Sequence, residues 1–69
     1  MNESKYMENR DKIIVALKDQ QLSMADIRRL TRVNYSTISA VVNELELSGK
    51  VKCDRVIKNG RAHRMVILI

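Results

Sequence analysis

Residues 23–49 read SMADIRRLTRVNYSTISAVVNELELSG, and two helix-start signals stand close together in this stretch. Ser23 and Asp26 form an S-x-x-D pattern, in which the serine hydroxyl accepts a hydrogen bond from an early backbone N–H and the carboxylate favours the positive end of the helix. Asn34 is one of the residue types preferred directly before a helix. Because only the turn at residues 31–33 separates the two predicted helices, the stretch predicts a helix-turn-helix.

The second predicted helix, at about residues 34–48, has one apolar and one polar face. Ile38, Val41, Val42 and Leu45 are spaced three, four and seven residues apart, so they share the face that packs on a core. The other face is polar or small, and it carries no charge from residue 35 to residue 43. Since an ordinary solvated helix face carries Lys and Glu pairs, this composition favours a surface that contacts DNA bases. The predicted outward residues are Tyr35, Ser36, Ser39, Ala40 and Asn43.

The first helix of the pair extends to about Arg32 and is expected to bury Met24 or Ala25 together with Ile27 and Leu30. An earlier helix is predicted at about residues 4–19, because one stripe of that segment combines apolar residues at helical spacing. The stripe consists of Tyr6, Arg10, Ile13, Ile14 and Leu17.

After Gly49, which is expected to end the helix in a left-handed conformation, the apolar period changes from 3.6 to 2. Two strands are predicted, at about residues 51–57 and 62–69, and Asn59-Gly60 between them is a strong signal for a type I′ hairpin turn. The hairpin, at about residues 50–69, carries six basic side chains against one acid, Asp54. Three helices followed by a basic two-stranded hairpin predict an α+β winged helix-turn-helix in a single domain, residues 1–69.

Charge is unevenly distributed along the 69 residues, whose net charge is +5. Residues 1–27 hold four basic and five acidic side chains, whereas residues 28–69 hold nine basic and three acidic ones. A basic C-terminal half favours a polyanionic partner, and double-stranded DNA is the expected one. No apolar run reaches the length of a membrane span, so we expect no membrane contact and a cytoplasmic protein.

Catalytic and metal-binding chemistry is not indicated. Cys53 is the single cysteine and is expected to be a small core residue, while His63, the single histidine, is expected to be exposed beside the wing. One cysteine and one histidine do not complete a structural zinc site, and no nucleophile-base pair or phosphate-binding glycine loop is visible. We therefore expect no enzyme activity, no cofactor and no metal.

Candidate DNA contacts divide among three places. The basic residues on the arms of the wing could instead protect a sheet edge, an explanation that fits the tip less well, and the arginines of the first helix of the pair could be ordinary surface residues. The polar face of the second helix is the candidate for base contacts. The complete set of candidate residues is Arg28, Arg29, Arg32, Asn34, Tyr35, Ser36, Thr37, Ser39, Asn43, Lys58, Arg61 and Arg64.

Four short motifs are distributed over nearly the whole length of the chain. They are S-x-Y-M at Ser4, Tyr6 and Met7, I-x-x-L-x-x-V-x-Y at Ile27, Leu30, Val33 and Tyr35, L-E-x-x-G-x-V at Leu45, Glu46, Gly49 and Val51, and G-x-A at Gly60 and Ala62. In these motifs the chain resembles the PapI/FaeA family of small fimbrial-operon regulators. The resemblance implies a bacterial regulator of an adhesin operon that works with a leucine-responsive global regulator at sites whose adenine methylation sets expression. Many of these positions also occur in MarR-like and ArsR-like regulators.

Other functions stay open at this point. A phage- or plasmid-type repressor would share the same fold, and a winged-helix adaptor for proteins would need an exposed apolar face on the second helix, where this chain is polar. A Z-DNA-binding domain would also use Asn and Tyr on the second helix. Such domains have Pro residues and a Trp in the wing, and this chain has neither residue type. The oligomeric state is expected to be a monomer or a weak homodimer.

Overall fold

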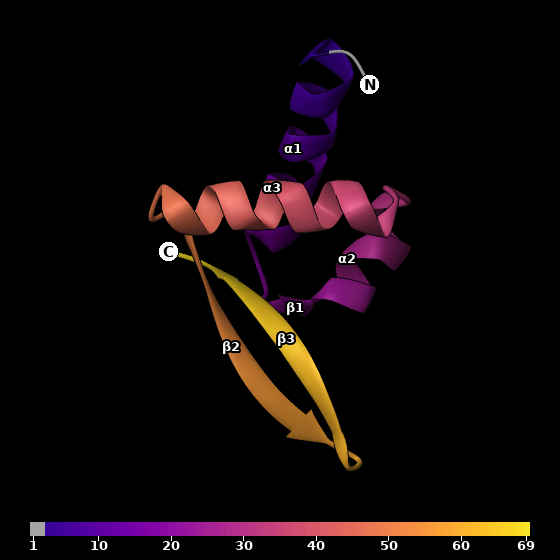
Figure 1. Ribbon diagram of the computed structural model, residues 1–69, viewed down its shortest axis with the longest axis vertical. Coiled ribbons are helices and arrows are strands. Elements are labelled where there is room, and N and C mark those ends of the chain that lie inside the picture. Colours follow the sequence, from indigo (N-terminus) through magenta and orange to yellow (C-terminus); the bar gives the residue numbers. More distant parts are fainter. Residues whose placement is uncertain (1–2) are drawn as a thin grey trace.

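The computed structural model describes residues 3–69, so the first two residues of the predicted domain lie outside the described range. It contains three helices and three strands in the order α1, β1, α2, α3, β2, β3 (Figure 1). Their bounds are Glu3–Leu17 for α1, Leu22–Ser23 for β1, Met24–Thr31 for α2, Tyr35–Leu47 for α3, Val51–Lys58 for β2 and Arg61–Leu68 for β3.

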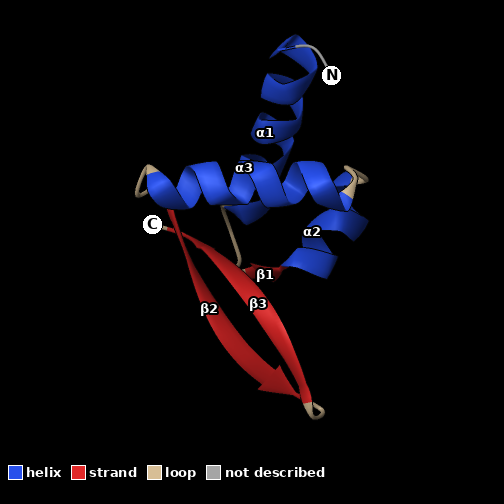
Figure 2. Ribbon diagram, in the orientation of Figure 1, coloured by secondary structure: helices blue, strands red, loops and turns tan. Residues whose placement is uncertain are grey.

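Helix α3 crosses the middle of the molecule, with α1 on one side and the hairpin of β2 and β3 extending away on the other (Figures 1 and 2). All four core-facing side chains predicted for α3 are fully buried, at 0% exposure. They are Ile38, Val41, Val42 and Leu45. The core against which they pack draws on α1, α2, the turn after α2 and the sheet, and it includes Ile13, Leu17, Met24, Ile27, Val33 and Val66.

The wing is the hairpin that the sequence predicts. Strands β2 and β3 pair antiparallel, with Lys58 opposite Arg61 at the tip and Val51 opposite Leu68 at the base. Both turn residues have positive φ, 52° at Asn59 and 74° at Gly60, which is the requirement of a type I′ turn. Gly49 also has φ 74°, so it ends α3 in the left-handed conformation that was expected.

One strand was missed, because the sheet has three strands in the order β1-β3-β2. Strand β1 pairs antiparallel with β3, placing Leu22 opposite Val66 and Ser23 opposite Met65. With only two residues, β1 carries no periodic signal, and its second residue also caps α2. This pairing attaches the base of the wing to the start of α2.

The expectation for the buried face of α2 was partly wrong. Met24 and Ile27 are buried, whereas Leu30 is 59% exposed and Ala25 is also exposed. Met24, Ile27 and the half-buried Thr31 share one side of the helix, and Leu30 lies beside that face instead of on it. Leu30 lines a shallow hollow with Val15 and Ala16 of α1 instead.

Replacing Leu45 by Ala should cost roughly 2–5 kcal/mol of unfolding free energy, because the removed methyl groups leave a cavity among fully buried neighbours. Leu47→Ala is the matched control, since Leu47 is 90% exposed on the same helix, and it should change stability by less than about 0.5 kcal/mol. Urea melts of the two variants measure the difference. Equal midpoints would show that the buried face of α3 is assigned incorrectly.

Candidate nucleic-acid interface

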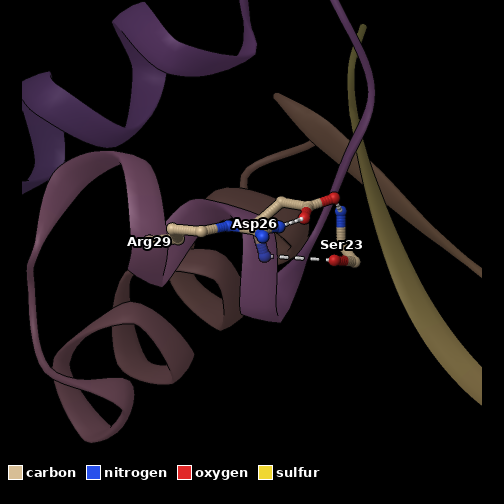
Figure 3. A network of polar contacts seen from close by, with 3 residues as sticks. All are labelled: Ser23, Asp26 and Arg29. Carbon is tan, nitrogen blue, oxygen red and sulfur yellow. Dashed lines mark hydrogen bonds and ion pairs between the residues drawn. The ribbon is translucent and has the colours of Figure 1, made fainter.

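The start of α2 is fixed by a reciprocal pair of hydrogen bonds. The backbone N–H of Asp26 donates to Ser23 Oγ at 3.1 Å, and the backbone N–H of Ser23 donates to Asp26 Oδ2 at 3.4 Å. Arg29, one turn further along, donates to the other carboxylate oxygen of Asp26 (Figure 3). The hydrogen bond with Ser23 is the main cause that holds the pKa of Asp26 below its ordinary value. The predicted capping box is therefore present, and Asp26 also orients Arg29.

The turn between α2 and α3 is held by hydrogen bonds of its backbone and of the Thr31 side chain. Arg32 ends α2 with φ 58°, and its N–H donates to the carbonyl of Arg28 at 2.8 Å. Thr31 Oγ1 donates to the carbonyl of Ile27 at 2.7 Å, and Val33 is buried with 7% exposure. Because the backbone at Arg32 turns while Val33 enters the core, the arginine side chain is left on the surface.

Asn34 caps α3 as predicted. Its side-chain Oδ1 accepts hydrogen bonds from the backbone N–H of Thr37 at 3.0 Å and from Ser36 Oγ at 2.8 Å. Because this oxygen is occupied, the amide NH₂ is the group of Asn34 that remains available to a ligand.

The exposed face of α3 carries most of the predicted side chains. Tyr35 is 54% exposed, Ser36 and Asn43 are exposed, and Ser39 is half-buried. Thr37 is an exception, since only 5% of it is exposed. It lies one residue before Ile38 and four before Val41, which places it on the core side of the helix. The expectation that Thr37 faces DNA is therefore corrected.

Three arginines come together beside the start of α3. Arg28, Arg29 and Arg32 line one open hollow of about 930 Å³, and Asn34 and Tyr35 line the same hollow. The two arginines of α2 and Arg32, which follows the helix, thus lie beside the residues at which the polar face of α3 begins.

The wing tip continues this basic surface. Lys58 and Arg61 flank the hairpin turn and are exposed. Lys58 and Asn59 line a second hollow with Arg29 and with His63, which is half-buried instead of exposed. Arg29 borders both hollows, so the wing tip, α2 and the start of α3 form one continuous surface, called here the basic track. Its cations are Arg28, Arg29, Arg32 and Lys58, which line the hollows, and Arg61, which lies opposite Lys58 in the hairpin.

Arg64 differs from the other predicted contacts, because its guanidinium is engaged within the chain. Its NH2 nitrogen donates to Asn43 Oδ1 at 3.2 Å and lies 3.5 Å from Glu46 Oε1. Cys53 is half-buried beside the core, and this burial is the main cause that raises the pKa of its thiol. A raised thiol pKa agrees with the expected structural role of Cys53.

Sequence reasoning missed the two glutamates of α3. Glu44 accepts a hydrogen bond from the Tyr6 hydroxyl, and its Oε1 lies 3.7 Å from Arg10 Nε, so it connects α3 with α1. Glu46 connects α3 with β3 through Arg64. These partners come from distant parts of the chain, and no local pattern in the sequence indicates them.

Among residues 3–69, no three His, Cys, Asp or Glu side chains are grouped so that they could hold a metal ion. No helix in this range has both the length and the apolar character needed to cross a membrane.

Solved structures share this fold. BpsR of Bordetella bronchiseptica, whose DNA binding is regulated by 6-hydroxynicotinic acid, matches with a TM-score of 0.78 and 21% identity over 100% of this chain. A transcriptional regulator homologue from Pyrococcus horikoshii OT3 matches 97% of the chain, and 69% of its own, with a TM-score of 0.73 and 20% identity. The match covers 52% of the BpsR chain, so this chain spans about half of that protein's length. No family model matches, and no curated protein matches either. The fold is a winged helix-turn-helix.

Ser23→Ala should cost about 1 kcal/mol of unfolding free energy, because the backbone N–H of Asp26 loses its acceptor. For a domain of this size that lowers the melting temperature by roughly 4–8 °C. Thermal melts at neutral pH measure the change.

The same capping box makes stability depend on pH. A carboxyl group whose pKa is lowered by folding stabilises the fold above its unfolded-state pKa, and that stabilisation is lost as the pH falls through the folded-state pKa. Asp26→Asn should therefore lower the melting temperature at neutral pH and have less effect in strong acid. Asp11→Asn, at an exposed position of α1, is the control. An equal effect of Asp26→Asn at both pH values would contradict the assigned role.

Proposed function

We propose that this protein is a sequence-specific DNA-binding transcription regulator without enzyme activity. The observation that carries the proposal is the basic track, which leads from the wing tip across α2 to the start of the polar face of α3. Cationic side chains in such an arrangement suit the phosphate backbone, and small hydroxyl and amide side chains suit base edges in the major groove.

The charges of the basic track support this function. Within the described residues, Arg29 is the only one of its five cations whose side chain makes a hydrogen bond or ion pair with the protein. The remaining four, Arg28, Arg32, Lys58 and Arg61, are exposed. Exposed positive charges that form no ion pair raise the local potential and attract a polyanion.

In this proposal each part has its own role. The side chains of α3 contact bases through Tyr35, Ser36, Ser39 and Asn43, while Asn34 contributes its amide NH₂ at the start of the helix. The arginines of α2 bind phosphates beside the major groove, and Lys58 and Arg61 bind the backbone or enter the minor groove.

The biological setting rests on the PapI/FaeA resemblance. It suggests a cytoplasmic bacterial regulator of a fimbrial operon that acts with a leucine-responsive global regulator, as a monomer or a weak homodimer. The two structural neighbours add support for regulation of transcription, because one is a transcriptional regulator homologue and the other binds DNA. Footprints on a fimbrial promoter with and without the leucine-responsive regulator test this setting, and no protection in either reaction would count against it.

A protein-binding role has one observation in its favour. Val15, Ala16 and Leu30 line an open hollow of about 610 Å³ between α1 and α2, and both Val15 and Leu30 are more than half exposed. This surface lies on other residues than the basic track, so a partner protein bound there would leave the proposed DNA contacts free.

Replacing both Lys58 and Arg61 by Ala should weaken binding to all duplexes to a similar degree, because phosphate contacts do not read sequence. The slope of log K against log salt concentration should become shallower by roughly two, since about 0.9 counterions are released per phosphate contact. Fluorescence anisotropy with unrelated duplexes at several salt concentrations measures both effects.

The control removes the same amount of positive charge from another part of the chain by replacing Lys18, the exposed residue that follows α1, with Glu. Lys18 belongs to the half of the chain without net positive charge, and the salt slope of the control should stay close to that of the wild type. Equal changes in Lys18→Glu and in the double variant of the wing would mean that net charge alone, and not the wing, sets the affinity.

Ser36→Ala tests whether α3 reads bases. Ser36 is exposed, so the fold should persist, while discrimination at particular base pairs should fall by roughly 1–3 kcal/mol. Ser48→Ala, beyond the end of α3, is the control. Competition gel shifts compare the variants, and unchanged discrimination in Ser36→Ala would remove Ser36 from the reading surface.

A further inference from the structure

Arg64 joins the wing to the polar face of α3. It lies in β3 directly opposite Arg55 of β2, and its guanidinium reaches across to Asn43 Oδ1 at 3.2 Å. Glu46 Oε1, one helical turn beyond Asn43, is 3.5 Å from the same nitrogen. Two side chains of α3 therefore hold one guanidinium of the wing.

The chemistry of this contact fixes which way the Asn43 amide faces. A guanidinium has five N–H donors and no acceptor, so it can only be satisfied by the amide oxygen. The reversed amide would place its NH₂ group against another donor and leave both without a partner. The oxygen of Asn43 is therefore turned toward Arg64, and the NH₂ group is turned away from it.

This orientation changes what an asparagine can read. An unrestrained Asn recognises adenine with both amide groups, since its oxygen accepts from N6 and its NH₂ donates to N7. With its oxygen turned toward Arg64, the amide presents its NH₂ donor on the side that the wing leaves unoccupied. In the major groove, guanine offers the acceptors N7 and O6, adenine offers N7 and thymine offers O4, whereas cytosine offers only a donor.

The salt bridge with Glu46 also affects what Arg64 itself does. A carboxylate at 3.5 Å offsets the charge of the guanidinium, and the Arg64 side chain is only 39% exposed. Both features make Arg64 a weaker phosphate ligand than the open cations Lys58 and Arg61, although the sequence suggests the same role for all three.

We propose that Arg64 is a positioning residue, which holds the Asn43 amide with its NH₂ group toward DNA so that Asn43 reads a hydrogen-bond acceptor on a base edge. The inference rests on the proposed DNA-binding function. It assigns to Arg64 an effect on sequence preference that is exerted through Asn43 and not by a contact of its own.

The test begins with a duplex library randomised over its central base pairs, from which the wild-type protein selects its preferred sequence. Binding to this duplex and to each of its single-base-pair variants is then measured for the wild type, Asn43→Ala, Arg64→Met and the double variant. Asn43→Ala should lose roughly tenfold discrimination at one base pair, and that base should present an acceptor. Arg64→Met should lose discrimination at the same base pair.

The double variant separates an indirect role from a direct one. If Arg64 acts through Asn43, the double variant should discriminate no worse than Asn43→Ala alone, because neighbouring residues in one contact are not additive. Arg64→Lys should restore part of the preference, since an ammonium group also donates only. Arg55→Met, at the exposed position opposite Arg64, is the matched control and should leave the pattern of preference unchanged.

Thermal melts show whether each variant still folds. If Arg64→Met does not fold, Glu46→Gln serves instead, because it loosens the guanidinium without removing it, and a smaller loss at the same base pair is expected.

Three results would overturn the inference while the proposed function stands. Arg64→Met could weaken binding to every duplex equally with a shallower salt slope, its effect could add to that of Asn43→Ala at a different base pair, or the base read by Asn43 could be cytosine. If the wild type enriches no sequence from the library, the proposed function fails and this inference fails with it.

Discussion

The burial of one face of α3 constrains the rest of this molecule. Four aliphatic side chains on that face have no exposed surface, and elements from both ends of the chain pack on them. The other buried residues form a single core around these four, so rotation of α3 about its axis would expose a large part of that core. The opposite face of α3 therefore points in one fixed direction. A surface that recognises the bases of a rigid duplex needs such a fixed direction.

The two glutamates of α3 add polar connections at the edges of this buried face. Glu44 joins α3 to α1 through Tyr6 and Arg10, and Glu46 joins it to the wing through Arg64. Each of these pairs is partly exposed, so its contribution to stability is small. Their main effect is on geometry, because the direction of the wing relative to α3 decides which groove positions the two elements can occupy together.

Local signals in the sequence were sufficient for most of the fold. The capping box at Ser23, the cap at Asn34 and the type I′ turn at Asn59 each depend on a few neighbouring residues, and all three are present in the structure. Features that depend on contacts between distant segments were not predicted. Strand β1 exists only because β3 passes beside it, and Leu30 is exposed because α2 turns the side of Met24 and Ile27 toward the core.

The candidate site shows the same division. The arginines of α2 and the polar side chains of α3 could be selected from composition and spacing, but their convergence on one hollow with Tyr35 needed the structure. Thr37 was misassigned although its spacing of four from Val41 placed it on the buried side. The attachment of Arg64 to Asn43 could not be predicted, since 21 residues separate them in the sequence.

The internal hydrogen bonds of the polar face determine which groups it offers to a ligand. The side-chain oxygens of Asn34 and Asn43 both accept hydrogen bonds from within the chain, so the amide NH₂ groups are the parts that remain. Arginine and lysine side chains next to them are also donors only. These donors are matched to phosphate oxygens and to the acceptors of purines and thymine, while the hydroxyls of Tyr35, Ser36 and Ser39 can both donate and accept. The selectivity of α3 then depends on the bonds within the chain that orient its amides as well as on the side chains that face outward.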